Sequence, residues 1–159
     1  MGLFRRLFGK TKESELSYGE KRGKLKEGRS GDDAPCRGDR EFVCERVEQA
    51  VAEVTASESY YYELRRNVMP QELGGDESIH PFTYGLYYNG APRLMILILE
   101  QSWGYKKKDV MAAHELCESR GIACMNLMLH LPNRKSYIIN RVRELLTRSE
   151  EHTSDLQSP

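Results

Sequence analysis

The sequence predicts an α/β domain of the α+β type, with a mixed four-stranded sheet, helices on the sheet faces and the element order α-β-β-β-α-β-α. Three observations predict it. Apolar residues recur at helical spacing in three separate segments. Two β-rich runs flank Asn89-Gly90, a pair typical of tight hairpin turns. One unbroken aliphatic run, and a second, mostly apolar run after Gly121, have the length and composition of buried strands.

Composition excludes several classes of protein. The 159 residues are 39% hydrophobic and 30% charged, and the 24 Lys and Arg balance the 24 Asp and Glu. This balance removes the usual charge signature of a nucleic-acid binder. The longest aliphatic run, Leu94 to Leu99, is far shorter than the roughly 20 residues that cross a bilayer. The cysteines lack CxxC spacing, so neither a zinc knuckle nor a disulfide framework is indicated, and we expect a cytoplasmic protein.

Residues 1–10 form a short amphipathic basic segment. At helical spacing, four apolar side chains share one side and arginines occupy the rest, as the run Leu3, Phe4, Arg5, Arg6, Leu7 and Phe8 shows. Such a segment suits the surface of an anionic membrane, and it resembles the openings of several bacterial peripheral membrane proteins. The alternative is a frayed start or a short helix docked on the domain. Peripheral contact with the inner face of the membrane is therefore one expectation.

Two further segments flank the predicted domain, which covers residues 41–147. Residues 11–40 are rich in Lys, Glu, Gly and Ser and predict a flexible linker, in which we expect Cys36 to be exposed. Residues 148–159, "RSEEHTSDLQSP", resemble a translated sequencing adapter and indicate an untrimmed sequence assembly. We expect this tail to be disordered, and the alternative is a natural polar tail.

The first half of the domain begins with an amphipathic helix over residues 42–54, capped by Asp39. An aromatic, β-favouring run at residues 60–68 predicts a strand, and residues 69–81 a loop. The hairpin follows, with strands at residues 82–88 and 93–100. A two-residue turn at Asn89-Gly90 places Tyr88 opposite Ala91 and Tyr84 opposite Met95.

The second half predicts a strand–helix–strand crossover and a last helix. The run "RLMILIL" is aliphatic without alternation, which is typical of a central strand covered on both faces. A helix around residues 110–117 ends at Gly121, and "IACMNLMLHL" then predicts a parallel strand that reaches Pro132. The last helix spans residues 138–146, and we expect Asn133 to cap it.

This order of elements, and the stretch "LILEQSWGYKKKDVMAAHELCESRGIACMNLML" in particular, resembles the core of the restriction-endonuclease-like, or PD-(D/E)XK, superfamily. The resemblance covers residues 41–147. It implies that Glu100 is the acid of the (D/E)XK element and would bind Mg²⁺, which would activate water against a phosphodiester.

The chain departs from that pattern at two positions. Ser102 stands where the superfamily has lysine, and the strand from Phe82 to Tyr88 offers no Asp. The first hypothesis is therefore a non-catalytic interaction or regulatory domain, without a cofactor and with an unnamed protein partner. The alternative is a Mg²⁺-dependent nuclease with a rearranged site, in which Glu100 binds the metal, Glu48 adds a carboxylate and Lys106 replaces the missing lysine.

A third hypothesis is a nucleic-acid-binding module that does not cleave. It depends on a basic cluster beside two aromatic residues, which together can stack a base and bind phosphates: Trp103, Tyr105, Lys106, Lys107 and Lys108. Three lysines before a helix more often form a solvated face. A zinc site using His114 and Cys117 with Cys124 or His130 is a weaker possibility, because the first two lie on an apolar helix stripe that favours core packing.

Overall fold

The structure is a computed structural model that describes residues 33–157, with side chains through Ser149. Contacts divide the chain into Met1–Ala34 and Pro35–Pro159. The second unit holds three α-helices and four strands, in the predicted order: α3 (Arg40–Val54), β1 (Tyr62–Val68), β2 (Phe82–Tyr88), β3 (Ala91–Leu99), α4 (Lys108–Ser119), β4 (Ala123–Met128) and α5 (Lys135–Gln157). Three short 3₁₀ helices lie between them, η1 (Ala56–Glu58), η2 (Pro70–Leu73) and η3 (Gly104–Lys106).

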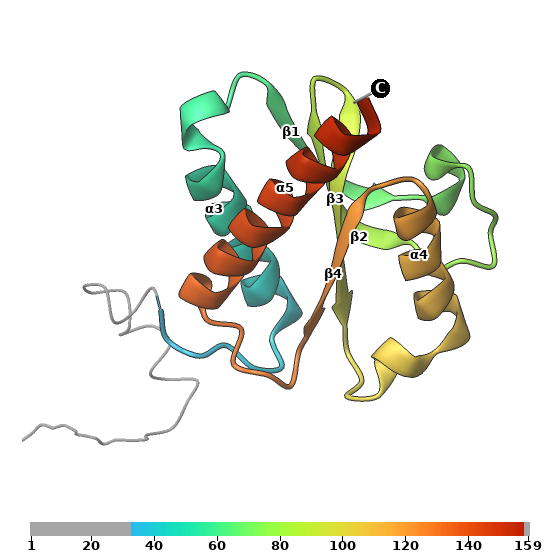
Figure 1. Ribbon diagram of the computed structural model, residues 1–159. Helices are drawn as coiled ribbons and strands as arrows, with labels where there is room; N and C mark the ends of the chain where they lie inside the picture. The colour runs from blue at the N-terminus through green and yellow to red at the C-terminus, as the bar shows by residue number, and fades with distance from the viewer. Residues whose placement is uncertain (1–32, 158–159) are drawn as a thin grey trace, which may run out of the picture. The chain divides into compact units, whose positions relative to one another are not determined.

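The strands form one mixed sheet in the order β1-β2-β3-β4 (Figure 1). β1, β2 and β3 are antiparallel neighbours, and β3 pairs with β4 in parallel, as the crossover predicts. β3 is therefore an interior strand, and every residue from Leu94 to Leu99 is buried. The prediction of a mixed four-stranded sheet is confirmed.

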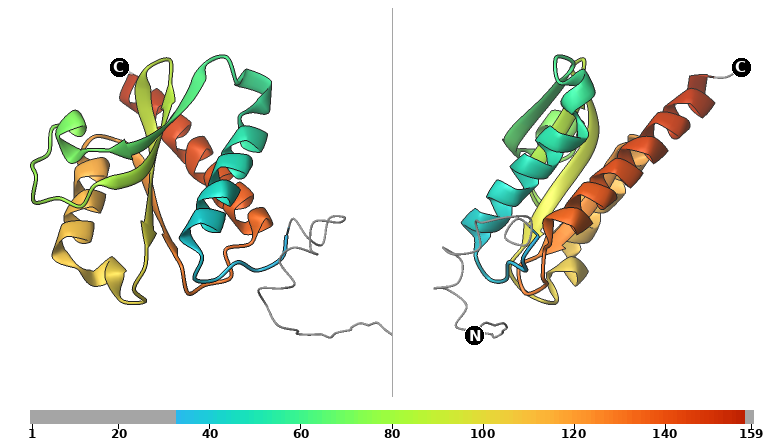
Figure 2. Two further views of the ribbon diagram at one scale, coloured as in Figure 1. Left: turned by 180° about the vertical axis from the view of Figure 1, so that it is seen from behind. Right: turned by 90° about the vertical axis from the view of Figure 1, so that its left-hand side faces the viewer.

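The helices cover both faces of the sheet, with α3 and α5 on one face and α4 on the other (Figures 1 and 2). Alternate residues of β3 divide between two cores because successive side chains point to opposite faces. Leu94, Ile96 and Ile98 pack with α3 and α5, whereas Met95, Leu97 and Leu99 pack with α4. This two-sided burial explains why the β3 sequence does not alternate between apolar and polar residues.

The β2–β3 hairpin turns at Asn89-Gly90 and pairs Tyr88 with Ala91 as predicted. The predicted pairing of Tyr84 with Met95 is wrong, because Tyr84 lies opposite Ile96. The register shifts between Leu86 and Tyr87, which adds one residue to the β3 side of the ladder. The shift fixes which aliphatic side chains of β3 face which helices.

The start of α3 confirms its predicted cap, since the Asp39 side chain accepts a hydrogen bond from the Phe42 N–H. The predicted exposure of Cys36 is wrong. Cys36 is buried, its N–H donates to the Pro132 carbonyl, and the Gly38 N–H donates to the Leu129 carbonyl. Two residues that the sequence assigns to the linker, Cys36 and Gly38, are thus bound to the domain by backbone hydrogen bonds.

Asn133 does not cap the last helix, which begins at Lys135. It is buried in the preceding loop with a positive φ of 48°, a conformation that asparagine tolerates better than most residues. Its side-chain amide donates to the carbonyls of Cys36, Met128 and Leu131. Asparagine is therefore needed here to join the chain before α3 to the end of β4.

The last helix is longer than predicted. α5 continues to Gln157, so residues 148–157 are helical where the sequence predicts a disordered tail. Extending an existing helix adds one hydrogen bond per residue without a new nucleation cost, which lets a polar segment continue a packed helix. The adapter origin of residues 148–159 stays a prediction.

Candidate functional site

Glu100 leaves the sheet directly after β3, at the edge where the parallel strands β3 and β4 end. Its side chain is 67% exposed, and its Oε2 lies 3.8 Å from Nη1 of Arg40 at the start of α3. The same Arg40 nitrogen donates to the Ile98 carbonyl at 3.1 Å. The nearest charged partner of the candidate acid is thus a guanidinium group held by the backbone of β3.

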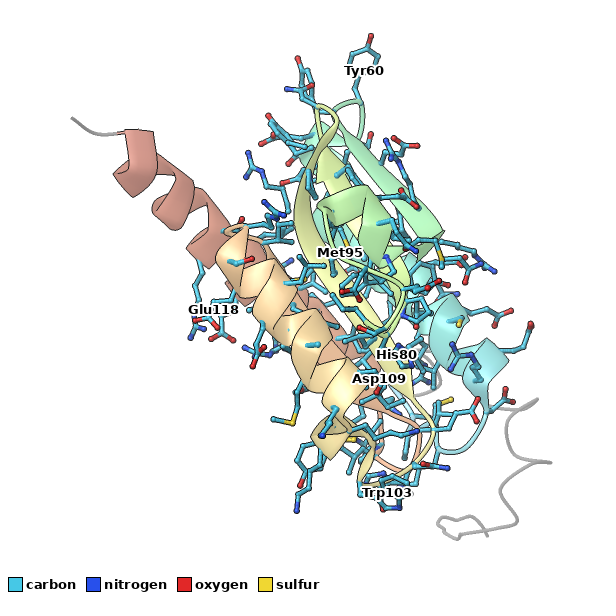
Figure 3. All side chains as sticks on the ribbon, turned by 90° about the vertical axis from the view of Figure 1, so that its right-hand side faces the viewer. Tyr60, His80, Met95, Trp103, Asp109 and Glu118 are labelled. Atoms are coloured by element: carbon cyan, nitrogen blue, oxygen red, sulfur yellow. The ribbon has the colours of Figure 1, made fainter. Side chains whose placement is uncertain are left out.

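An open cleft of about 320 Å³ surrounds this pair. Its polar side chains come from four segments: Arg40 from α3, His80 from the loop before β2, Glu100 and Gln101 from the end of β3, and Lys107 from the residue before α4. Figure 3 shows His80 beside Asp109 at the start of α4, with Trp103 at the same end of the unit and Tyr60 at the opposite end. Ligands of open α/β sheets commonly bind at the carboxyl ends of parallel strands.

Glu48 lies elsewhere. Its carboxylate accepts a hydrogen bond from the Tyr84 hydroxyl at 2.5 Å and pairs with Arg66. Tyr84 lies opposite Ile96, four residues or roughly 13 Å along the strand from Glu100. The structure therefore does not bring the two predicted carboxylates together.

The environment of Glu48 shifts two pKa values. The Tyr84 hydrogen bond, followed by Arg66, lowers the pKa of Glu48 below its ordinary value of 4.5, although partial burial opposes the shift. Burial, followed by the hydrogen bond to Glu48, raises the pKa of the Tyr84 hydroxyl. Glu48 is thus a charged acceptor that holds α3 to β2.

The basic and aromatic segment after β3 is exposed, with 53% of Trp103 and 43% of Tyr105 accessible. The ammonium of Lys106 lies 5.6 Å from the Tyr105 ring centroid, and that of Lys107 lies 5.7 Å from the Trp103 ring centroid. Lys107 also lines the cleft that contains Glu100, which Lys106 and Lys108 do not. Of the three lysines, Lys107 therefore shares a site with the candidate acid.

His114 and Cys117 of α4 and Cys124 of β4 have structural roles. His114 Nε2 lies 2.8 Å from Asn126 Oδ1 on β4, and Cys117 is fully buried. The hydrogen bond that the Cys124 thiol donates to Cys117, followed by burial, raises the pKa of the Cys124 thiol, which keeps it protonated. Across the part of the chain that the structure describes, no three His, Cys, Asp or Glu side chains come together to hold a metal ion.

Sequence reasoning missed Arg40 and His80 as members of the cleft. Arg40 stands in the predicted linker, and His80 in a loop without a motif. The signal that could have found Arg40 is the Asp39 cap, because it fixes where α3 begins. Nothing in the sequence around His80 indicates that its loop reaches the end of β3.

Comparison with known proteins found no matching family model, curated protein or solved structure. None of the helices between residues 33 and 157 has both the length and the apolar character needed to cross a bilayer. The candidate membrane residues 3–8 lie outside the described residues.

Proposed function

We propose that residues 41–147 form a non-catalytic interaction domain on an endonuclease-like sheet, which binds its partner at the carboxyl end of β3. The observation that carries the proposal is the surroundings of Glu100. Glu100 lies beside Arg40, and Glu48, the second predicted carboxylate, instead binds Tyr84 and Arg66. A Mg²⁺ site prefers several oxygen ligands, and a nearby guanidinium group opposes cation binding.

The exposed segment Trp103 to Lys108 supplies the contact surface in this proposal. Partly exposed aromatic rings next to cationic side chains are typical of binding surfaces. We further propose that residues 1–10 bring the domain to the cytoplasmic face of a membrane, as their amphipathic pattern favours.

A second candidate function is nucleic-acid binding without cleavage. The specific observation in its favour is that Trp103 and Tyr105 present accessible rings beside three lysines, the combination that binds single strands. Under this candidate, Lys106, Lys107 and Lys108 contact phosphates, and the affinity falls steeply with added salt.

A cleavage assay separates the interaction domain from the nuclease alternative. The purified protein is incubated with single- and double-stranded DNA in Mg²⁺ or Mn²⁺, beside the variant Glu100→Gln. We expect no cleavage by either protein. Metal-dependent cleavage that Glu100→Gln abolishes and the matched control Glu118→Gln retains would overturn the proposal, since Glu118 is an exposed acid on α4 away from the cleft. Cleavage that both variants retain would identify a contaminant.

A further inference from the structure

We propose that the cleft beside Glu100 binds the phosphate group of a small phosphorylated molecule. The inference rests on the proposed function and names the ligand chemistry of the same surface. The cleft has three nitrogen-bearing side chains that can be cationic, from three separate segments: Arg40, His80 and Lys107. Among the residues that line the cleft, one carboxylate, that of Glu100, opposes them. The cationic groups therefore outnumber the acid even when His80 is neutral.

Each of the three side chains has donor or acceptor capacity left for a ligand. One nitrogen of Arg40 is held by the Ile98 carbonyl, which orients the guanidinium group and leaves its other N–H groups for an anion. His80 Nδ1 lies 2.7 Å from the Pro81 carbonyl and so carries the ring proton. Nε2 is then the ring atom left to a ligand, as an acceptor from a phosphate hydroxyl or as a donor when the ring is charged.

Lys107 adds a movable charge. Its ammonium lies 5.7 Å from the Trp103 ring centroid, on a stem that also lines the cleft. A flexible four-carbon stem lets such an ammonium turn from the ring towards an anion without backbone movement. The N-terminus of α4, which has no side-chain cap and where Val110 lines the cleft, adds a weaker attraction for negative charge.

The size of the cleft favours a small ligand over a polymer. A volume of about 320 Å³ lies at the low end of the range of small-molecule sites, which begins at about 300 Å³. A phosphate monoester carries more charge than a carboxylate and has several oxygens for donors from different sides. Glu100 already supplies one carboxylate to Arg40, so a competing ligand needs the greater charge.

Calorimetric titration of the full chain tests the inference, with inorganic phosphate, adenosine 5′-monophosphate and a twelve-nucleotide DNA strand as probes. Acetate at matched ionic strength serves as the comparator. We expect phosphate and the nucleotide to bind and acetate not to bind. We expect Lys107→Gln to weaken the affinity for phosphate about three- to fivefold, which is the range for loss of one exposed charge pair. We expect Glu100→Gln to raise the affinity for phosphate by a similar factor, because this substitution removes the opposing negative charge.

The matched control is Arg141→Gln, which removes one positive charge on α5 and should leave phosphate affinity unchanged. Equal weakening by Lys107→Gln and Arg141→Gln would overturn the inference, since it would show attraction by net charge alone. Weaker phosphate binding by Glu100→Gln would also overturn it. Binding of the DNA strand without either small probe would assign the surface to nucleic acid, and binding of no probe would reject the phosphate site. The DNA result would favour the second candidate function, whereas binding of no probe leaves the proposed interaction domain standing, because the cleavage assay tests that domain separately.

Discussion

At the scale of single residues, Glu48 is a carboxylate that the sequence offers as a catalytic residue and that stabilises the fold in the structure. Its partner Tyr84 is 1% exposed and lies in the core between the sheet and α3 and α5. A buried hydroxyl needs a hydrogen-bond partner, and Glu48 supplies a charged one. The pKa of Glu48 is lowered in the folded state, so its contribution to stability is present above pH 4.5 and is lost as the pH falls through the folded-state pKa.

We predict that Tyr84→Phe lowers the free energy of unfolding by about 1 kcal/mol at pH 7, because one hydrogen bond to a partly exposed carboxylate is lost. The difference from the unsubstituted chain should shrink as the pH falls from 7 towards 3, through the lowered pKa of Glu48, because a protonated carboxyl group is a weaker acceptor than a charged one. Urea unfolding at both pH values measures it.

The control for this prediction is Tyr87→Phe on the same strand. The Tyr87 hydroxyl is buried and meets no hydrogen-bond partner among the described residues, so its removal should leave stability unchanged or slightly raised. A larger loss for Tyr87→Phe than for Tyr84→Phe would contradict the role given to Glu48.

At the scale of elements, the β2–β3 hairpin sets the positions of the core residues of β3. The turn needs two residues with positive φ, and Asn89 and Gly90 adopt φ values of 52° and 83°. The strand register shifts between Leu86 and Tyr87, so that Leu94, Ile96 and Ile98 face α3 and α5. A change at the turn should therefore affect stability although the turn itself is exposed.

We predict that Gly90→Ala destabilises the protein by about 1–2 kcal/mol, the cost of a left-handed backbone for an L-residue. No atom lies within 4 Å of the position of the added Cβ, so the effect is conformational and not steric. Gly104→Ala is the control, because Gly104 lacks a positive φ and the added Cβ would meet Leu99 at 3.4 Å, close to ordinary contact. Thermal unfolding that shifts equally in both variants would refute the argument.

At the scale of the whole molecule, two buried clusters lie on opposite faces of one sheet. The cluster towards α3 and α5 includes Leu145 and Leu146, and no hydrophobic residue after them belongs to it within the described side chains. Beyond Thr147, Ser149 is buried and Arg148 is exposed. Within the described side chains, the apolar core therefore ends at Leu146, before the adapter-like segment begins.

We predict that a chain shortened to residues 1–147 keeps its fold and changes its free energy of unfolding by no more than about 0.5 kcal/mol, as is usual when no core packing is lost. Urea unfolding of the full and shortened chains, followed by circular dichroism, measures the difference. A loss of several kcal/mol would show that residues after Thr147 belong to the folded domain, and would argue against an adapter origin.

Local sequence patterns were sufficient to predict the helices and strands and their order along the chain. Apolar spacing located α3 and α4, the Asn-Gly pair located the hairpin, and the unbroken aliphatic run of β3 identified a strand covered on both faces. These features depend on residues that are near one another in sequence, and each has a local physical cause in side-chain periodicity or backbone conformation.

Features that depend on residues far apart in the sequence could be identified only from the tertiary structure. The bulge in the hairpin, the loop role of Asn133 and the burial of Cys36 each arise from partners that the sequence does not place side by side. The candidate site shows the same division. Sequence placed Glu100 at the end of a strand, but the pairing with Arg40, the separation from Glu48 and the entry of His80 and Lys107 into one cleft arise from packing between elements far apart in the chain.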